Sequence, residues 1–212
     1  MISVVLADDH VVVRTGIKML LDADPDIEVV AEAAEGTEAY SLAARYKPDV
    51  LLLDISMPPG QSGLIACEKT AKDFPDTKVV ILTMFAEPEY LLYTLRGGAA
   101  GYVLKNSTPE QLRQAVHDVA NGGSYIHPTM VELLAKHATS GSSDPSIQQL
   151  SSRELEILQL IARGHTNKEI SKMMFLSVKT VEAHRSKIYK KLHLKTRADA
   201  VDYALRHKLL DL

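Results

Sequence analysis

The sequence predicts an α/β domain with a doubly wound parallel sheet of five strands, followed by a smaller all-α domain of four helices. Three observations lead to this prediction. Short apolar runs alternate with helix-period segments in the first half, a small polar stretch at 139–146 interrupts the pattern, and only helix-period segments follow it. A chain of 212 residues also has room for two domains of ordinary size.

Five segments rich in Val, Leu and Ile account for the predicted strands. Each is apolar on both faces, as expected of parallel strands that helices cover on both sides of a sheet. The strands are expected at 2–7, 27–33, 50–53, 79–82 and 101–104, and the helices near 11–22, 36–46, 63–73, 87–97 and 108–121. Strict alternation of the two predicts right-handed crossovers, with ligands bound beyond the carboxyl ends of the strands.

The second half is predicted to be helical after a short connecting helix at 131–138. Its four helices are expected near 151–163, 166–173, 177–192 and 196–207, and each opens on a candidate N-cap: Ser151, Thr166, Ser177 and Thr196. The chain therefore divides into a first domain at 1–122, a connecting helix and linker at 123–149 and a second domain at 150–212.

The charge of the chain is unevenly distributed. Residues 1–145 hold 11 Lys and Arg against 20 Asp and Glu, a formal charge of −9, whereas residues 146–212 hold 13 against 7, a charge of +6. This asymmetry favours a nucleic-acid-binding module joined to an acidic domain, although a basic half can also be an ordinary solvated surface.

The ends of the chain and its cysteine content restrict the class of protein. No apolar run approaches the ~20 residues that cross a bilayer, and the opening residues, MISVVLADDH, lack the basic start and cleavage site of a signal peptide. We therefore expect a cytoplasmic protein with no membrane partner. Cys67, the only cysteine, permits no internal disulfide and is expected to be a buried structural residue rather than a redox group.

Charged and polar side chains follow the predicted strands. Asp8 and Asp9 come after the first strand, Asp54 after the third, Thr83 after the fourth and Lys105 after the fifth. Because the carboxyl ends of parallel strands meet at one edge of a sheet, these side chains should converge. Three carboxylates repel one another unless a cation compensates them, and such oxygen ligands suit Mg²⁺. An aspartate nucleophile, a lysine and Mg²⁺ together are suited to phosphoryl transfer. The alternative interpretation is that these acids are exposed loop residues without a function.

The predicted helix at 177–192 is strongly basic. It carries Lys179, Arg185, Lys187 and Lys190 and follows a shorter helix after a tight turn. Such a helix can enter the major groove of DNA while its lysines meet phosphates. A basic helix alone is more often a solvated face, so the prediction depends on the surrounding helix-turn-helix pattern.

The first half resembles the receiver domain of bacterial response regulators. The pair Asp8-Asp9, the segment Asp54-Ile-Ser-Met-Pro58, Thr83 and Lys105 follow the order and spacing of that family. The resemblance implies that a partner histidine kinase phosphorylates Asp54. It also implies that Asp9, Asp54 and the backbone carbonyl of Ser56 hold Mg²⁺, that Asp8 assists, that Lys105 pairs with the phosphoryl oxygens, and that Thr83 and Tyr102 form the phosphoryl switch. A plain core aromatic is the alternative for Tyr102.

One stretch departs from the receiver pattern. The segment from Met57 to Gly63, MPPGQSG, is one residue longer than usual in the family, and Ser62 replaces the usual acid. Because this loop borders the expected phosphorylation site, we expect kinase docking or the rate of dephosphorylation to differ.

The second half resembles LuxR-type helix-turn-helix domains, and its pairing with a receiver is typical of the NarL/FixJ family of two-component response regulators. The resemblance rests on GHTNKEI at 164–170, LSVKTVEAH at 176–184 and KLHL at 191–194. It implies base-facing positions at Glu182, Ala183 and Ser186, phosphate contacts from Lys179, Thr180, Arg185, Lys187 and Lys190, and scaffold contacts from Asn167 and Lys168. Glu182 replaces a lysine common in some relatives and could accept a hydrogen bond from cytosine N4.

A further resemblance concerns the subgroup. MPPGQSGL at 57–64 and LTMF at 82–85 are similar to segments of the Nre-type regulators of nitrate and oxygen response in Gram-positive bacteria. This resemblance implies an oxygen-sensing histidine kinase as partner and nitrate-respiration genes as targets.

Two other functions share parts of the pattern. A phosphoester hydrolase with an aspartyl-phosphate intermediate would need a second acid two residues after the nucleophile, where this chain has Ser56. A DNA-binding protein with an inert receiver would not need the complete set of acids, threonine and lysine. We therefore expect a transcription factor, not a metabolic enzyme, in which phosphorylation favours a homodimer that binds double-stranded DNA. RNA polymerase is a candidate partner.

Overall fold

The structure is a computed structural model of the chain and describes residues 1–57, 62–84, 86, 88–139, 150–174, 176–207 and 209–210. The chain divides into two compact units, residues 1–141 and 142–212. The end of the predicted connecting segment, residues 140–149, lies outside the described residues.

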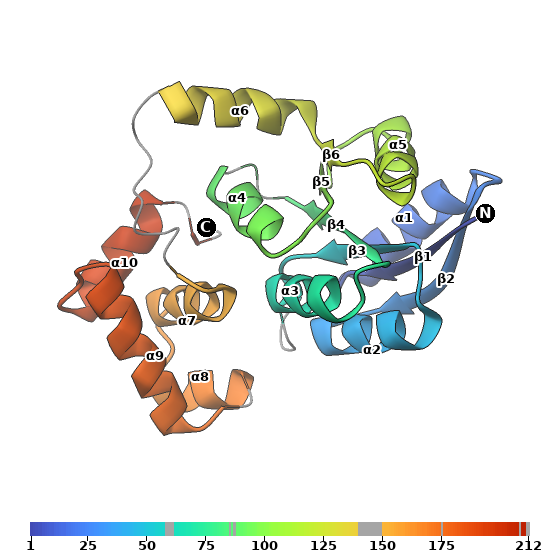
Figure 1. Cartoon of the computed structure of the whole chain (residues 1–212). Helices are drawn as coiled ribbons and strands as arrows, with labels where there is room; N and C mark the ends of the chain where they lie inside the picture. The colour runs from blue at the N-terminus through green and yellow to red at the C-terminus, as the bar shows by residue number, and fades with distance from the viewer. Residues whose placement is uncertain are drawn as a thin grey trace. The chain divides into compact units, whose positions relative to one another are not determined.

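A parallel sheet with the strand order β2-β1-β3-β4-β5-β6 forms the centre of the first unit (Figure 1). Its strands are β1 (Ile2–Ala7), β2 (Ile27–Ala33), β3 (Val50–Asp54), β4 (Lys78–Thr83), β5 (Gly101–Leu104) and β6 (Tyr125–Ile126). Every neighbouring pair is parallel. The predicted doubly wound sheet is confirmed, and its order reverses between β1 and β3, where such sheets bind ligands.

The prediction of five strands was wrong by one. Tyr125 and Ile126 form β6, in register with Gly101 and Tyr102 of β5. A strand of two residues is too short to produce an alternating pattern in the sequence, so periodicity could not reveal it. The helix that follows, α6 (Pro128–Thr139), starts earlier than the predicted 131–138 and contacts α4 (Pro88–Arg96).

Helices cover both faces of the sheet. Figure 1 shows α1 (Val11–Asp22) and α5 (Pro109–Ala120) on one face, with α2 (Gly36–Tyr46) and α3 (Gly63–Asp73) on the other. The core under α1 and α5 joins their apolar sides to the strands through Ile17, Leu21, Leu112, Ala115, Val116 and Val119. This packing holds the carboxyl ends of the strands at one edge.

The described part of the second unit consists of α7 (Ser152–Ala162), α8 (Asn167–Met173), α9 (Val178–Lys191) and α10 (Arg197–Arg206). The predicted four helices and their N-caps are confirmed. The side chains of Ser151, Thr166, Ser177 and Thr196 each accept a hydrogen bond from the backbone N–H three residues later. A 2.5 Å ion pair between Lys191 and Glu154 joins α9 to α7.

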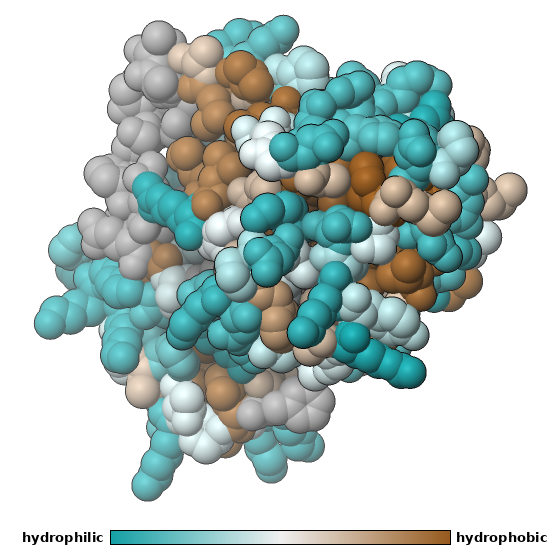
Figure 2. Space-filling view, turned by 45° about the vertical axis from the view of Figure 1, so that its right-hand side comes forward, coloured by the Kyte–Doolittle hydropathy of each residue, from teal (hydrophilic) through white to brown (hydrophobic). Residues whose placement is uncertain are grey.

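On the face in Figure 2, hydrophilic side chains predominate and apolar ones appear in smaller areas between them. Exposed large apolar side chains are most frequent on α1: Val11, Val12, Met19 and Leu20. No helix in the described part of the chain is both long and apolar enough to cross a bilayer.

Candidate metal site and nucleic-acid interface

The carboxyl ends of the strands bring three charged side chains into contact. Lys105, directly after β5, places Nζ 2.7 Å from Asp8 Oδ2 and 2.8 Å from Asp54 Oδ2. Asp8 follows β1 and is fully buried, and Asp54 ends β3 and is 3% exposed. The convergence that the sequence predicted for these three residues is therefore present in the structure.

Burial controls the charges in this cluster. Loss of solvent around Asp54, with Asp8 nearby, raises the pKa of its carboxyl from 3.8 to about 6, although the Lys105 ammonium opposes the shift. Burial also disfavours the ammonium of Lys105, but Asp54 and Asp8 outweigh that effect and raise its pKa. Lys105 is therefore charged at neutral pH and compensates carboxylates that would otherwise repel each other.

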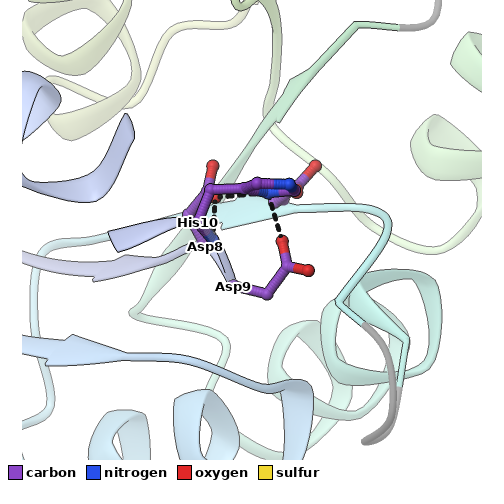
Figure 3. Close-up of side chains that lie close together, drawn as sticks. Asp8, Asp9 and His10 are labelled. Carbon is purple, nitrogen blue, oxygen red and sulfur yellow. Dashed lines mark hydrogen bonds and ion pairs between the residues drawn. The ribbon is translucent and has the colours of Figure 1, made fainter. Parts of the chain in front are cut away.

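Asp9 lies on the solvent side of this cluster, next to a residue that the sequence analysis did not single out. The imidazole Nδ1 of His10 lies 2.7 Å from Asp9 Oδ1 and 3.5 Å from Asp8 Oδ1 (Figure 3). The backbone N–H of His10 also donates to Asp8 Oδ1 at 2.8 Å. Its position directly after the acidic pair was the available signal, but the predicted site consisted of oxygen donors alone.

The donor set fits a divalent cation. Ligand atoms of Asp8, Asp9, His10 and Asp54 all lie within 4.8 Å of one another. Asp8 Oδ2 is buried against the Lys105 ammonium, and the buried Asp9 Oδ1 has the His10 ion pair but no hydrogen-bond donor among the described residues. Ser56, predicted to add its carbonyl, is half-buried, and its backbone N–H donates to the Asp54 carboxylate.

Gly63 closes the loop beside this site. Its N–H donates to the Ile55 carbonyl at 2.9 Å, and a Cβ at this position would overlap the backbone carbonyl of Asp54. Only glycine therefore permits α3 to start so close to β3. The rest of the unusually long loop, residues 58–61, lies outside the described residues.

The two predicted switch residues lie on neighbouring strands. Thr83 ends β4 and Tyr102 lies in β5, and both are fully buried. The Thr83 carbonyl accepts a 2.8 Å hydrogen bond from the N–H of Lys105, which links it to the acidic cluster. Tyr102 pairs with Ile81 on one side and with Ile126 of β6 on the other.

Cys67 has no part in the site. It is buried in α3, and burial raises the pKa of its thiol to about 12. A thiol with such a pKa stays protonated and unreactive at neutral pH, which confirms the structural interpretation.

The predicted DNA contacts lie on α8 and α9. Several of these residues are exposed: Lys168 on α8, and Lys179, Glu182, Ala183, Ser186, Lys187 and Lys190 on α9. Asn167, Thr180 and Arg185 are half-buried. Thr180 Oγ1 is 2.8 Å from the Ser177 hydroxyl, and the Arg185 guanidinium lies 5.1 Å from the centre of the Tyr189 ring.

Comparison with known families matches both halves of the chain. The response regulator receiver domain matches residues 4–117, and the bacterial regulatory proteins of the luxR family match residues 148–204. The oxygen regulatory protein NreC of Staphylococcus carnosus (strain TM300) is 51% identical over 99% of both chains. NreC of Staphylococcus aureus (strain bovine RF122 / ET3-1) is 53% identical over the same share.

Solved structures are similar over both units. RcsB from Salmonella enterica serovar Typhimurium, bound to promoter P1flhDC in the presence of the phosphomimetic BeF3⁻, has a TM-score of 0.71 and 29% identity, covering 100% of this chain and 99% of its own. The response regulator ChrA of a heme-sensing two-component system has a TM-score of 0.56 and 33% identity, covering 99% and 98%.

Proposed function

This chain belongs to the LuxR family of bacterial response regulators, and from that membership we propose that phosphorylation of Asp54 by a histidine kinase controls its binding to DNA. The chain is a DNA-binding regulator of transcription and not a metabolic enzyme. In this proposal residues 1–122 are the receiver, 123–149 connect the domains and 150–212 bind DNA.

The observation that carries the proposal is the Lys105 ammonium held between Asp8 and Asp54, 2.7 and 2.8 Å from their carboxylates. Such a cation can transfer its contact from the Asp54 carboxylate to the oxygens of a phosphoryl group on the same side chain. Asp9, Asp54 and the carbonyl of Ser56 would hold Mg²⁺, with Asp8 assisting. Bound there, Mg²⁺ would supply positive charge beside the transferred group, and Asp54 would supply the attacking oxygen.

The switch in this proposal consists of Thr83 and Tyr102. The Thr83 hydroxyl turns toward the new phosphoryl group, and Tyr102 repacks in the space that this movement changes. Both side chains are fully buried in the unphosphorylated protein. Because a packed core has little free volume, a movement of one side chain displaces its neighbours. This change favours a homodimer. Its two copies of α9, one from each chain, bind DNA half-sites that lie about one helical turn apart.

DNA contact is assigned to α8 and α9. Glu182, Ala183 and Ser186 face the bases. Phosphates are contacted by Lys179, Thr180, Arg185, Lys187 and Lys190, and Asn167 and Lys168 seat the scaffold on the backbone. The exposure of α9's lysines and the +6 charge of residues 146–212 support this assignment. RNA polymerase is a further candidate partner of this chain.

The stimulus is proposed from the relatives. Proteins 51–53% identical over nearly the whole chain carry the name oxygen regulatory protein. We therefore assign this chain to a pathway in which an oxygen-sensing histidine kinase is the phosphoryl donor and nitrate-respiration genes are targets.

The test uses acetyl phosphate and Mg²⁺ as a chemical phosphoryl donor. Intact mass and sedimentation are compared for the wild type, Asp54→Asn and Asp76→Asn, the last an exposed acid away from the site. We expect a phosphoryl adduct and a heavier species only in the wild type and in Asp76→Asn, and neither in Asp54→Asn. An Asp54→Asn protein that still dimerises under these conditions would refute the proposal, and no adduct in any protein would indicate an inert receiver.

A further inference from the structure

We infer that His10 supplies a nitrogen ligand to the acidic site, so that this site binds a first-row transition metal ion of the Ni²⁺ and Zn²⁺ type as well as Mg²⁺. The inference rests on the proposed metal site at Asp9 and Asp54 and extends its ligand set by one side chain.

The spacing of the atoms is close to that of a coordination sphere. His10 Nδ1 lies 2.7 Å from Asp9 Oδ1 and 3.5 Å from Asp8 Oδ1, and all the candidate ligand atoms, Asp54 included, lie within 4.8 Å of one another. Around an octahedral ion with ligands at about 2.1 Å, adjacent ligand atoms are about 3 Å apart and opposite ones about 4.2 Å. The limit of 4.8 Å lies above the separation of opposite ligands, about 4.2 Å, so a single ion can reach the nitrogen and all the carboxylates once their side chains rotate toward it.

The contact between His10 and Asp9 is an ion pair and not a hydrogen bond. Asp9 Oδ1 lies 2.7 Å from the imidazole Nδ1, and this buried oxygen accepts no hydrogen bond from the described residues. A buried carboxylate oxygen without a donor is costly. A cation that both atoms bind would remove this cost.

The position of His10 suits a ligand more than a packing residue. Its side chain is 67% exposed, whereas that of Asp8 is fully buried and that of Asp9 is 19% exposed. The backbone N–H of His10 donates to Asp8 Oδ1, which fixes the start of its side chain beside the carboxylates. The imidazole thus lies beside the two carboxylates (Figure 3), and its exposure leaves it open to solvent.

The two classes of ion should respond differently to the loss of this nitrogen. Mg²⁺ prefers oxygen ligands and keeps several waters, so it gains little from an imidazole. Imidazole is a good ligand for Zn²⁺, Fe²⁺ and Ni²⁺. Removal of His10 should therefore change the ratio of Ni²⁺ to Mg²⁺ affinity, which a purely structural role would leave unchanged.

The experiment measures Ni²⁺ and Mg²⁺ binding to the full chain by calorimetry. Because the chain has eight histidines, the relevant Ni²⁺ signal is the part that excess Mg²⁺ displaces. His10→Ala is compared with the wild type, with His165→Ala as a control in the other unit and with Asp9→Asn as a variant without the shared site. We expect His10→Ala to weaken this Ni²⁺ binding by about tenfold or more, since even loss of outer-shell support costs 10–100-fold, and to leave Mg²⁺ binding nearly unchanged.

Each other outcome overturns the inference in a distinguishable way. An equal loss for both ions in His10→Ala would make His10 only a residue that orients Asp9. Unchanged affinities for both ions would remove His10 from the site. A wild type that binds neither ion, like Asp9→Asn, would overturn the proposed metal site itself and this inference with it.

Discussion

The backbone N–H of His127 donates a 2.9 Å hydrogen bond to the carbonyl oxygen of Tyr102. This bond and the one from Tyr125 N–H to the Ala100 carbonyl, 3.1 Å long, attach β6 to the outer side of β5. The connecting segment is thus bonded to the same residue that is proposed to repack on phosphorylation. A movement of Tyr102 would therefore be felt directly at the start of α6.

Replacing His127 should show how much this bond contributes. His127→Pro removes the N–H, and His127→Ala keeps it but loses the same buried side chain. We expect His127→Pro to have a free energy of unfolding about 1 kcal/mol lower than His127→Ala, the usual net value of a backbone hydrogen bond. Urea denaturation of the full chain measures the difference, and equal stabilities would mean that β6 is not held by this bond.

The two glycines Gly63 and Gly16 should respond in opposite directions to alanine. A Cβ at Gly63 would overlap the Asp54 carbonyl, so Gly63→Ala should destabilise the receiver by about 1–3 kcal/mol. Gly16 lies within α1, and nothing lies within 4 Å of an added Cβ, so Gly16→Ala should stabilise it by about 0.5–1 kcal/mol. Denaturant midpoints measure both changes.

The pair of variants also tests the site. Gly63→Ala should lower the yield of phosphoryl adduct from acetyl phosphate because Asp54 must shift, whereas Gly16→Ala should not. A normal adduct yield in a destabilised Gly63→Ala would show that the Asp54 backbone tolerates the displacement.

The raised pKa of Asp54 predicts how stability depends on pH in the metal-free protein. An acid with a pKa of 3.8 when unfolded and about 6 when folded binds its proton more tightly in the folded state. Stability should therefore fall as pH rises from about 4 to about 6, by on the order of 2–3 kcal/mol from this group. Asp54→Asn cannot ionise, so it should lack this decrease and be more stable than the wild type at pH 7.

Unfolding curves in the presence of a chelator, measured at several pH values, provide the comparison. Asp49→Asn is the control, because hydrogen bonds from Ser3 lower the pKa of Asp49. The Asp49→Asn replacement should therefore lower the free energy of unfolding at neutral pH, whereas Asp54→Asn should raise it. Parallel profiles for the wild type and Asp54→Asn between pH 4 and 6 would contradict the prediction.

Glu182 should specify a base. It is exposed on α9, and a carboxylate there can accept from cytosine N4 and rejects bases without a donor in that place. Selection from randomised duplexes should therefore show one position where cytosine is favoured by about 1–3 kcal/mol, and Glu182→Ala should lose that preference. Asp202→Asn, an exposed acid on α10, should select the same sequences as the wild type.

Most of the fold was predictable because its signals are local. Strands such as β3, whose five residues are all buried, appear in the sequence as apolar runs. The first residue of a helix is indicated by the capping residue before it. Thr108, for example, accepts from Gln111 N–H and completes a capping box at the start of α5. β6 could not be predicted because two residues carry no periodicity and its pairing with β5 depends on tertiary contact.

The candidate site was also predictable only in part. Asp8, Asp54 and Lys105 were predictable since strand ends in a parallel sheet must meet, and each residue directly follows or ends a strand. His10 was missed because its contact to Asp9 depends on the side-chain conformation at the start of α1. The pKa of Asp54 was equally beyond the sequence, since it depends on how completely the carboxyl is removed from water.

The sheet ends on one side in β6, a strand of two residues, and on the other in β2, which carries the exposed acids Glu28 and Glu32. Unpaired strand edges are templates on which other chains add strands and aggregate. A two-residue edge is too short to act as one, and exposed carboxylates oppose pairing along the other. The receiver can therefore be present at high concentration without its sheet becoming a starting point for fibrils.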